Sequence, residues 1–464
     1  MIKIQRKMQL KHEVTEKIII ILASIIFVYL LISLFFTKHF FLHTEINGVN
    51  VSLKSHKDTD QMIRDYINSY QLQLIERNGT MEVIEAHEIG MRLNQNNSIN
   101  KIHRIQKSFR WVNSFFRDQD YRLKDVFAYD EASLRKKIDG LNCLNTSTVE
   151  PRNVGFQYKN GSYELIQEVY GNKINQENLI DAIKKHIQMG LTQLDLDQNK
   201  CYVNPKYTVN SKKTHETYAL LNKYVATKIT YEFGDKVELV DGNIINEWLS
   251  VDDNFDIHID KAAVREYMKD LSKKYDTVGI ARQFKTSTGK TVEVKGGLYG
   301  WKMDQETETK AVIEHITLGQ IIKKEPTYLQ TAISRGEDEI GNTYVEINIT
   351  RQHLWFYKEG KLIAQGAVVT GNPNRGNATV LGIYMLNYKQ RDAMLSGPGY
   401  EVKVTYWMPF FGNIGLHDAS WRYNFGGQIY KVNGTHGCVN ASYYLAKKIF
   451  ENIDSGVPII SYEE

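Results

Sequence analysis

The sequence predicts a multidomain chain with one transmembrane helix, two α+β modules and a mostly-β C-terminal domain. Three features support this: an uncharged apolar run near the N-terminus, a repeated segment in the middle of the chain, and period-two alternation towards its end. With 464 residues, the chain is too long for one ordinary core. We expect five segments, with these bounds: cytoplasmic tail 1–17, transmembrane helix 18–36, first module 44–215, second module 216–335 and C-terminal domain 340–464.

The apolar run, Ile18–Phe36, contains 19 uncharged residues and would cross about 30 Å of hydrocarbon as a helix. It is followed by Thr37 and Lys38 rather than by a small-residue cleavage site, which favours an uncleaved anchor over a signal peptide. Basic residues outnumber Glu13 and Glu16 before the run: Lys3, Arg6, Lys7, Lys11 and Lys17. This bias predicts a cytoplasmic N-terminus and an extracytoplasmic remainder. The alternative is a buried core helix.

The middle of the chain predicts α+β modules with an internal repeat. Alternation around Asn47-Gly48 predicts a short hairpin, and the first soluble domain begins near Thr44. Residues 171–190 align without gaps to residues 300–319, each with a capping Asn or Asp before about four helical turns and a final Gly. We therefore expect a duplicated module, in which the paired histidines, His186 and His315, are ordinary core or surface residues.

The last domain is expected to be rich in strands. Residues 344–371 alternate with a period of two around Glu359-Gly360, which predicts a β-hairpin. A helix is expected only at 441–453, and the sheet is expected to end with residues 456–462.

Composition and cysteine content limit the possible functions. The formal net charge of +4 is small, and no basic block resembles a phosphate-binding arm, so we expect no nucleic-acid partner. Three cysteines are too few for a disulfide framework, and an odd number leaves at least one thiol unpaired. Cys143 and Cys201 have no histidine nearby in sequence and are expected to be inert packing residues or to pair with each other. A pairing of the two would leave Cys438 as the free thiol.

The free thiol lies in the segment 433–442, "NGTHGCVNAS", with His436 two residues before Cys438. A thiol with a pKa near 8.5 needs a base to become a nucleophile at neutral pH. If 414–417 pairs with 435–438, His417 can reach the sulfur across a tertiary contact, while His436 would share a strand face with Cys438. The backbone N–H groups of Gly437 and Cys438 could then serve an oxyanion.

Three other interpretations compete with a catalytic pair. His417, His436 and Cys438 could bind zinc, although there is no CxxC motif and no obvious fourth ligand. The histidines could be structural neighbours of a buried cysteine. Asn433-Gly434-Thr435 also matches the N-glycosylation sequon, which carries no weight in a chain of bacterial character.

The spacing of these residues resembles a known family. His417, a 17-residue spacer and then Thr435-His436-Gly437-Cys438-Val439-Asn440 is similar to the signature of the L,D-transpeptidases, the YkuD-like catalytic domain. The similarity extends across about residues 340–463, and the upstream modules resemble the peptidoglycan-binding-like domains that precede this enzyme in Gram-positive bacteria. One departure is Thr379-Val380-Leu381-Gly382, where many relatives have Thr-Pro-x-Gly. The missing proline would loosen a turn and touches no expected catalytic atom.

The resemblance implies an enzyme that cross-links the cell wall. Its cysteine attacks the L-to-D peptide bond before the terminal D-Ala of a tetrapeptide stem, and an amine of a second stem then takes the acyl group in a 3→3 cross-link. Carbapenems are expected to acylate the same thiol, and no metal or organic cofactor is implied. The implied catalytic residues are Cys438 as nucleophile, His417 as proton donor and acceptor, His436 and Gly437. The implied substrate-binding residues are Thr435, Asn440, Asp418, Trp407 and Tyr406.

Two other functions fit the same sequence. The Cys-His pair could transfer the acyl group to water, as a carboxypeptidase or endopeptidase does. The protein could instead be a wall-binding scaffold with a vestigial catalytic domain. For all three functions we expect a single-pass protein of the cell membrane, with its C-terminal domain outside the cytoplasm at the wall and with peptidoglycan stem peptides as partners.

Overall fold

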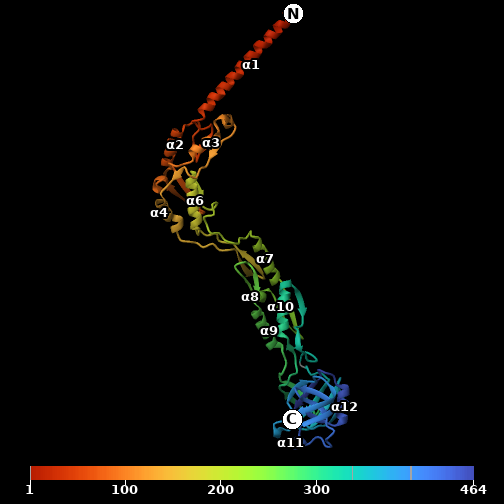
Figure 1. Cartoon of the computed structure of the whole chain (residues 1–464). Helices are drawn as coiled ribbons and strands as arrows, with labels where there is room; N and C mark the ends of the chain where they lie inside the picture. Colours follow the sequence, from red (N-terminus) through yellow and green to blue (C-terminus); the bar gives the residue numbers. More distant parts are fainter. Residues whose placement is uncertain (1, 337, 398–399) are drawn as a thin grey trace. The chain divides into compact units, whose positions relative to one another are not determined.

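The computed structural model describes residues 2–336, 338–397 and 400–464 (Figure 1). The chain forms two compact units, one made of residues up to 155 together with 166–211, the other of 156–165 together with 212–464. The expected fold class is confirmed: an apolar N-terminal helix, α+β modules, and a mostly-β C-terminal domain. The bounds expected for the two modules, 44–215 and 216–335, stay predictions.

The N-terminal helix, α1 (Ile2–Phe35), contains the apolar run. Among the described residues, one helical stretch is long and apolar enough to cross a membrane, Leu10–Phe35. Its serine hydroxyl groups are satisfied within the helix, because Ser24 and Ser33 each donate to the carbonyl four residues earlier, at 2.8 Å. Apolar surroundings require such internal pairing of polar groups.

The first unit continues with small sheets and helices around one apolar core. The hairpin expected around Asn47-Gly48 is confirmed, with Ile46 opposite Val49. Asn47 is fully buried, and its side-chain amide donates to the carbonyls of Leu123 and Gln188. The elements of this unit after α1 are β1 (Thr44–Ile46), β2 (Val49–Asn50), α2 (His56–Ser69), β3 (Gln71–Ile75), β4 (Met81–Glu85), η1 (Ala86–Ile89), β5 (Arg92–Leu93), α3 (Ile99–Gln106), η2 (Ser108–Phe115), β6 (Gln119–Tyr121), β7 (Phe127–Ala128), α4 (Glu131–Asp139), α5 (Asn142–Asn145), α6 (Gln176–Met189) and β10 (Gln193–Asp195).

The second unit begins with a hairpin that the sequence analysis assigned to the first module. Tyr163 of this hairpin is buried in the core of the second unit, where its N–H donates to Asn222 and its hydroxyl to Asn246, each at 2.8 Å. The elements of this part are β8 (Gly155–Lys159), β9 (Ser162–Ile166), α7 (Lys212–Val225), β11 (Lys228–Phe233), β12 (Lys236–Val240), α8 (Gly242–Glu247), β13 (Leu249–Val251), β14 (Ile257–Ile259), α9 (Lys261–Tyr275), β15 (Arg282–Lys285), β16 (Thr291–Val294), β17 (Lys302–Met303), α10 (Gln305–Leu318), β18 (Ile321–Lys324) and β19 (Tyr328–Gln330).

The repeated segments form the matching helices α6 and α10, as predicted. The side chains of Asn175 and Asp304 cap their N-termini, and Gly190 and Gly319 end them in the left-handed conformation. A side chain at the N-cap accepts from an otherwise unpaired N–H, and glycine adopts a positive φ without strain. The shared caps therefore explain why both copies form helices of the same length.

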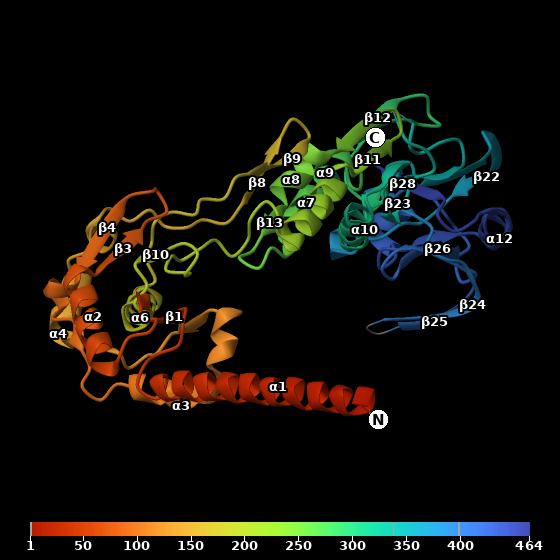
Figure 2. The ribbon, with the colours of Figure 1, turned by 90° about the horizontal axis from the view of Figure 1, so that it is seen from above.

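The C-terminal domain contains a five-stranded sheet, β22-β21-β20-β28-β23, and a four-stranded sheet, β24-β25-β26-β27. The hairpin expected at Glu359-Gly360 is confirmed by the pairing of β21 with β22. The expectation of a single helix was wrong, because the short helix α11 precedes α12. Figure 2 shows the β24–β25 hairpin projecting from the body of this domain. The elements are β20 (Tyr344–Asn348), β21 (His353–Lys358), β22 (Lys361–Ala367), η3 (Pro373–Arg375), β23 (Gly382–Met385), β24 (Gln390–Gly397), β25 (Tyr400–Phe411), β26 (Ile414–Asp418), α11 (Ile429–Asn433), β27 (Val439–Ala441), α12 (Tyr443–Asn452) and β28 (Pro458–Tyr462).

A buried carboxylate joins the five-stranded sheet to the preceding β15–β16 hairpin. Glu346 of β20 is fully buried and accepts from the backbone N–H of Ser287, at 2.9 Å, and from the hydroxyl of Tyr462, at 2.6 Å. Phe284 and Val294 of the hairpin pack in one apolar cluster with residues of β23 and β28. Within the second unit, the five-stranded sheet and this hairpin therefore share a core.

Candidate active site

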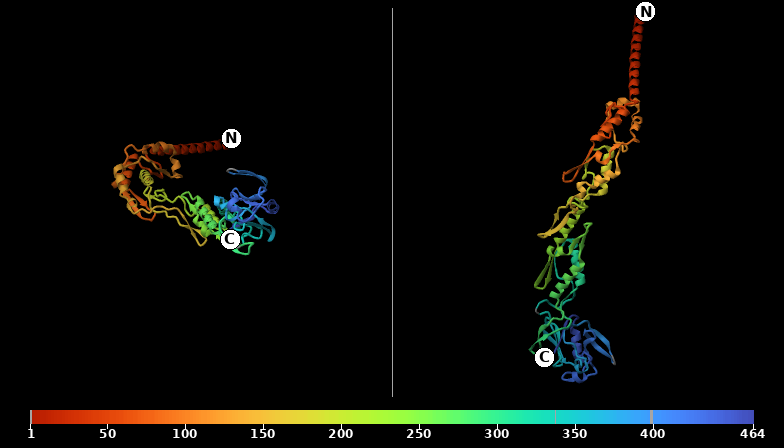
Figure 3. Two further views of the ribbon diagram at one scale, coloured as in Figure 1. Left: turned by 90° about the horizontal axis from the view of Figure 1, so that it is seen from below. Right: turned by 90° about the vertical axis from the view of Figure 1, so that its left-hand side faces the viewer.

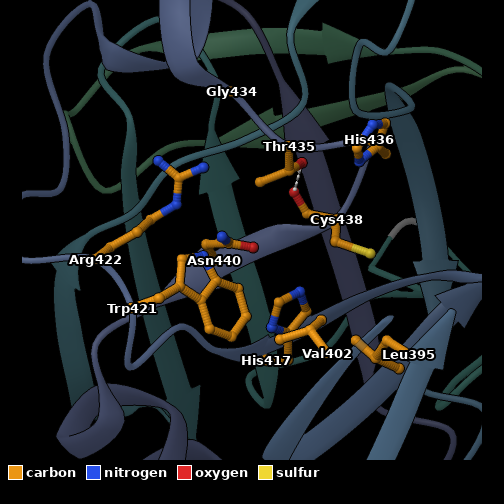
Figure 4. A pocket seen from close by; sticks show the side chains of 10 residues that line it. All are labelled: Leu395, Val402, His417, Trp421, Arg422, Gly434, Thr435, His436, Cys438 and Asn440. Atoms are coloured by element: carbon orange, nitrogen blue, oxygen red, sulfur yellow. Dashed lines mark hydrogen bonds between the residues drawn. The ribbon is translucent and has the colours of Figure 1, made fainter. Parts of the chain in front are cut away.

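Two adjacent parallel strands bring the predicted histidine and cysteine together. β26 pairs with β27 so that Leu416 lies opposite Val439 and His417 opposite Asn440. Cys438 immediately precedes β27, so its side chain lies next to the strand that carries His417. Both side chains line one pocket of about 310 Å³ (Figure 4).

The pocket has an apolar side and a polar side (Figure 4). Leu395 and Val402 come from the projecting β24–β25 hairpin, whereas most of the polar groups come from β26, β27 and the loops that precede β27. The lining residues are Leu395, Val402, His417, Trp421, Arg422, Gly434, Thr435, His436, Cys438 and Asn440.

His417 is buried and held by its own backbone neighbour. It is 4% exposed, and its Nδ1 lies 2.9 Å from the carbonyl oxygen of Asp418. When Nδ1–H donates to this carbonyl, Nε2 carries the lone pair. Burial lowers the pKa of the imidazole, and the bond to Asp418 opposes this shift more weakly. His417 is thus a neutral base at neutral pH.

Cys438 is partly exposed to the pocket, and its thiol is protonated in the resting state. Sγ lies 3.5 Å from the carbonyl oxygen of Asn413. Burial raises the pKa of the thiol, and a hydrogen bond from the backbone of Gly415 offsets part of that rise. The resting pair is therefore neutral thiol and neutral imidazole rather than thiolate and imidazolium.

The turn before Cys438 differs from the expected strand. β27 begins at Val439, and residues 436–437 form a bend, so His436 and Cys438 do not share a strand face. The cause is Gly437, whose φ of +117° lies in a region that L side chains rarely adopt. His436 is exposed at the rim of the pocket. The N–H of Gly437 donates to Thr435 Oγ1 at 3.1 Å and is already engaged, in contrast to the expected oxyanion role.

Hydroxyl groups hold this turn from both sides. Thr435 Oγ1 donates to the carbonyl of Cys438 at 2.6 Å. Thr379 is buried, and its Oγ1 donates to the carbonyl of Gly437 at 2.8 Å while accepting from the N–H of Gly371 at 2.8 Å. Sequence reasoning assigned no site contact to the 379–382 segment, because a tertiary hydrogen bond leaves no local pattern.

The remaining predicted site residues divide between the pocket and its support. Asn440 lines the pocket, and its buried Oδ1 has no hydrogen-bond partner among the described residues. The carboxylate of Asp418 accepts from the backbone N–H of Tyr406 at 2.7 Å, so only its carbonyl serves His417. The side chain of Tyr406 lies in the core beside Tyr443, at 5.4 Å between ring centroids, instead of forming a pocket wall. Side chains alternate along β25, so Trp407, which also does not line the pocket, points towards His417 instead.

Two indole rings contact the imidazole. The ring centroid of Trp407, a buried residue, lies 5.8 Å from that of His417, and the centroid of Trp421 lies 6.0 Å away. Trp421 lines the pocket and was missed in the sequence, although it follows the signature histidine by four residues. Apolar rings exclude water from the base and add to the burial that lowers its pKa.

Arg422 is the second pocket residue that sequence reasoning missed. Its Nη1 donates to the carbonyl of Asn433 at 2.8 Å, whereas its buried Nε has no partner among the residues that the structure describes. Burial lowers the pKa of the guanidinium, which nevertheless remains charged at neutral pH. Arg422 thus adds a cation to the lining of the pocket.

The structure also bears on the other interpretations of the cysteines. Within residues 2–336, 338–397 and 400–464, no group of His, Cys, Asp and Glu side chains is arranged to hold a metal ion. Cys143 and Cys201 are both buried and unpaired. Burial raises their pKa values to about 12 and about 11, so both thiols are inert at neutral pH.

Comparisons with known proteins assign the domains. The L,D-transpeptidase catalytic domain, YkuD, matches residues 342–460, and a peptidoglycan binding domain matches twice, at 82–193 and 207–321. The double match confirms the predicted duplication. The comparison with curated proteins finds no match.

Two solved structures are similar to this chain in sequence. A cysteine-to-serine mutant of the Enterococcus faecium L,D-transpeptidase is 31% identical, over 53% of this chain and 100% of that chain, with a TM-score of 0.44. The catalytic domain of the E. faecium enzyme acylated by ertapenem is 34% identical, over 26% of this chain and 98% of that chain, with a TM-score of 0.25. With this identity over the full length of the relative, the chain belongs to the L,D-transpeptidases.

Proposed function

We propose that the chain is a membrane-anchored peptidoglycan L,D-transpeptidase that forms 3→3 cross-links through an acyl-enzyme on Cys438. The observation that carries the proposal is the convergence of a buried neutral imidazole and a thiol on one pocket. The family supports the reaction class, and the geometry supports the roles proposed for individual residues.

Acylation begins from the neutral pair. His417 Nε2 takes the thiol proton as Sγ attacks the carbonyl carbon of the L-to-D bond before the terminal D-Ala. The carbon–nitrogen bond then breaks, His417 gives the proton to the leaving amine, and D-Ala departs. A thioester to Cys438 remains, the proton leaves with D-Ala, and His417 is neutral again.

Transfer to the second stem repeats these steps in reverse order. His417 removes a proton from the acceptor amine, which attacks the thioester carbonyl, and the thiol recovers the proton when the carbon–sulfur bond breaks. Water in place of the amine would give hydrolysis. The apolar walls formed by Leu395, Val402 and Trp421 favour the amine, because they limit the water that reaches the thioester.

Residues around the pair position the substrate. Arg422 presents a cation to a carboxylate of the donor stem, and Asn440 offers its unpartnered Oδ1 to a donor group of the peptide. Thr435 and Gly437 act through the shape of the turn, and His436 forms the rim. Trp407 and Asp418 act through His417: the indole excludes water and the carbonyl fixes the tautomer.

We also propose that the rest of the chain holds this domain at the wall. We propose that α1 crosses the cytoplasmic membrane of a Gram-positive-like bacterium once, with its N-terminus inside, because basic residues precede the apolar run. Both peptidoglycan binding domains then lie outside the membrane, where their ligand is found. Donor tetrapeptide and acceptor stem are the proposed partners.

The decisive test uses the full chain in nanodiscs with a disaccharide-tetrapeptide and mass spectrometry. We expect a cross-linked dimer and free D-Ala; tripeptide alone would show a hydrolase, and unchanged substrate a scaffold. Cys438→Ala should abolish both dimer formation and covalent labelling by ertapenem. Cys143→Ala is the matched control and should retain both, since Cys143 is buried in the first unit and does not line the pocket. Labelling that survives Cys438→Ala would refute the assignment.

A further inference from the structure

The segment 99–117, which contains α3 and η2, combines basic and exposed apolar side chains. It has no acidic residue, and it carries five basic ones: Lys101, Arg104, Lys107, Arg110 and Arg117. Five of its apolar side chains are exposed, from 39% for Val112 to 82% for Phe116: Ile105, Phe109, Val112, Phe115 and Phe116. Contiguous exposed apolar surface with flanking cations is typical of segments that lie in a membrane interface.

This segment packs directly against the N-terminal helix. The ring centroid of Trp111 in η2 lies 5.7 Å from that of Tyr29 and 6.1 Å from that of Phe36. The hydroxyl of Tyr29 also donates to the carbonyl of Phe109. Both elements belong to the first unit (Figures 1 and 3). The segment is therefore held beside the apolar run of α1.

The contact sets the depth of the segment relative to that run. Tyr29 precedes Phe36 by seven residues, which corresponds to about 10 Å along a helix. If α1 crosses the membrane as proposed, Trp111 lies below the outer end of the apolar run. Tryptophan is enriched at this level of a bilayer.

An apolar groove of about 470 Å³ lies between the two elements. The polar side-chain groups in its lining are the hydroxyls of Ser24 and Tyr29 and the indole N–H of Trp111. The described lining residues are Ile20, Ile21, Ser24, Ile25, Val28, Tyr29, Ile32, Trp111 and Val112. In water this apolar surface would be hydrated, which is unfavourable, whereas a lipid acyl chain matches it in shape and polarity.

The backbone of η2 is prepared for apolar surroundings. A carbonyl in hydrocarbon is costly unless it accepts a hydrogen bond. The carbonyl of Phe109 accepts from Tyr29, that of Trp111 from Ser114 Oγ at 2.6 Å, and that of Asn113 from the N–H of Phe116 at 3.2 Å. These pairings allow a short non-α helix to enter the interface.

We propose that segment 99–117 docks in the outer leaflet beside α1, with its aromatic side chains among the acyl chains and its basic side chains on anionic phospholipid headgroups. The inference rests on the proposed anchoring by α1. Continuity with the apolar run and the one-sided charge favour lipid over a protein partner. The first module is then fixed to the membrane at two places and cannot rotate freely about α1.

The test measures the depth of a spin label on the full chain in vesicles of phosphatidylglycerol and phosphatidylcholine. The label is placed by Phe116→Cys in a Cys438→Ser background, where the buried Cys143 and Cys201 do not react. Accessibility to oxygen, relative to a water-soluble nickel chelate, reports contact with lipid. Ile25→Cys reports α1 itself, and Met81→Cys, at another exposed apolar residue of the same module, is the matched aqueous control.

We expect the ratio of oxygen to nickel-chelate accessibility at Phe116→Cys to resemble the ratio at Ile25→Cys. It should exceed the ratio at Met81→Cys several-fold. A water-exposed label at Ile25→Cys would overturn the anchor as well. If the label at Ile25→Cys is exposed to lipid but the label at Phe116→Cys is exposed to water, the docking of segment 99–117 is overturned and the anchoring by α1 is retained. Protection from both reagents at Phe116→Cys would show a protein partner, such as a second copy, and also overturn it.

The headgroup contact has its own test. In vesicles without phosphatidylglycerol, or with Lys107, Arg110 and Arg117 all changed to Gln, the label at Phe116→Cys should become several-fold more accessible to the nickel chelate. Equal protection in all three samples would overturn the anionic-lipid contact.

Discussion

Thr379 should control acylation although it touches no substrate. Thr379→Val keeps the shape of the side chain and removes the hydroxyl that joins the Gly437 carbonyl to the Gly371 N–H, two bonds of 2.8 Å. Each buried group left unpaired costs roughly 1–3 kcal/mol. We assume that only the bond to Gly437 holds Cys438 in its attacking position. If its loss raises the barrier to acylation by about 1.4 kcal/mol, within this range, the rate falls tenfold.

The assay is the second-order rate constant for acylation by ertapenem, followed by mass spectrometry on the full chain. We expect about a tenfold loss for Thr379→Val and near wild-type rates for Thr379→Ser, which keeps the hydroxyl. Circular dichroism checks that both variants are folded. A folded Thr379→Val variant with the wild-type rate would refute the view that this hydroxyl positions the nucleophile.

Three further predictions concern protonation and the core. As the pH is lowered, the acylation rate should fall only below pH 6.5, because burial lowers the pKa of His417 and the imidazole must be neutral to act as base. A pH–rate profile in which the rate is already half-lost above pH 7 would contradict this. Iodoacetamide at pH 8 should modify one thiol per native chain, Cys438, and three per denatured chain, as counted by mass spectrometry. Glu346→Ala should lower the unfolding free energy of the second unit by about 3 kcal/mol, since it leaves several buried donors unpaired. Calorimetry measures this change, and Glu401→Ala, at an exposed glutamate, is the control that should leave the unfolding free energy nearly unchanged.

Local signals explain which parts of the fold the sequence predicts correctly. The α6 and α10 repeats have caps within the segment itself, and the β21–β22 hairpin has its turn residues in place. The hairpin 155–166 carries strand signals, but its location depends on bonds from Tyr163 to side chains far along the chain. Nothing near it in sequence indicates which core it joins.

The same distinction applies to the site. His417 and Cys438 come together because β26 and β27 pair in parallel, a pairing that the signature spacing indicates. Thr379 and Arg422 contribute through contacts across the fold, for which spacing gives no signal. His436 was expected beside Cys438 on a strand, but the positive φ of Gly437 turns the chain between them.

The neutral resting pair also bears on how the enzyme keeps its thiol from being oxidised. Thiolate rather than thiol is the form that oxidants attack. Burial keeps Cys143 and Cys201 protonated, and it keeps Cys438 protonated until a base removes the proton. Because His417 is a weak base in its buried place, it forms thiolate only as the carbonyl carbon is attacked. General-base catalysis and the protection of the thiol from oxidation therefore have the same physical cause, the low polarity around the pair.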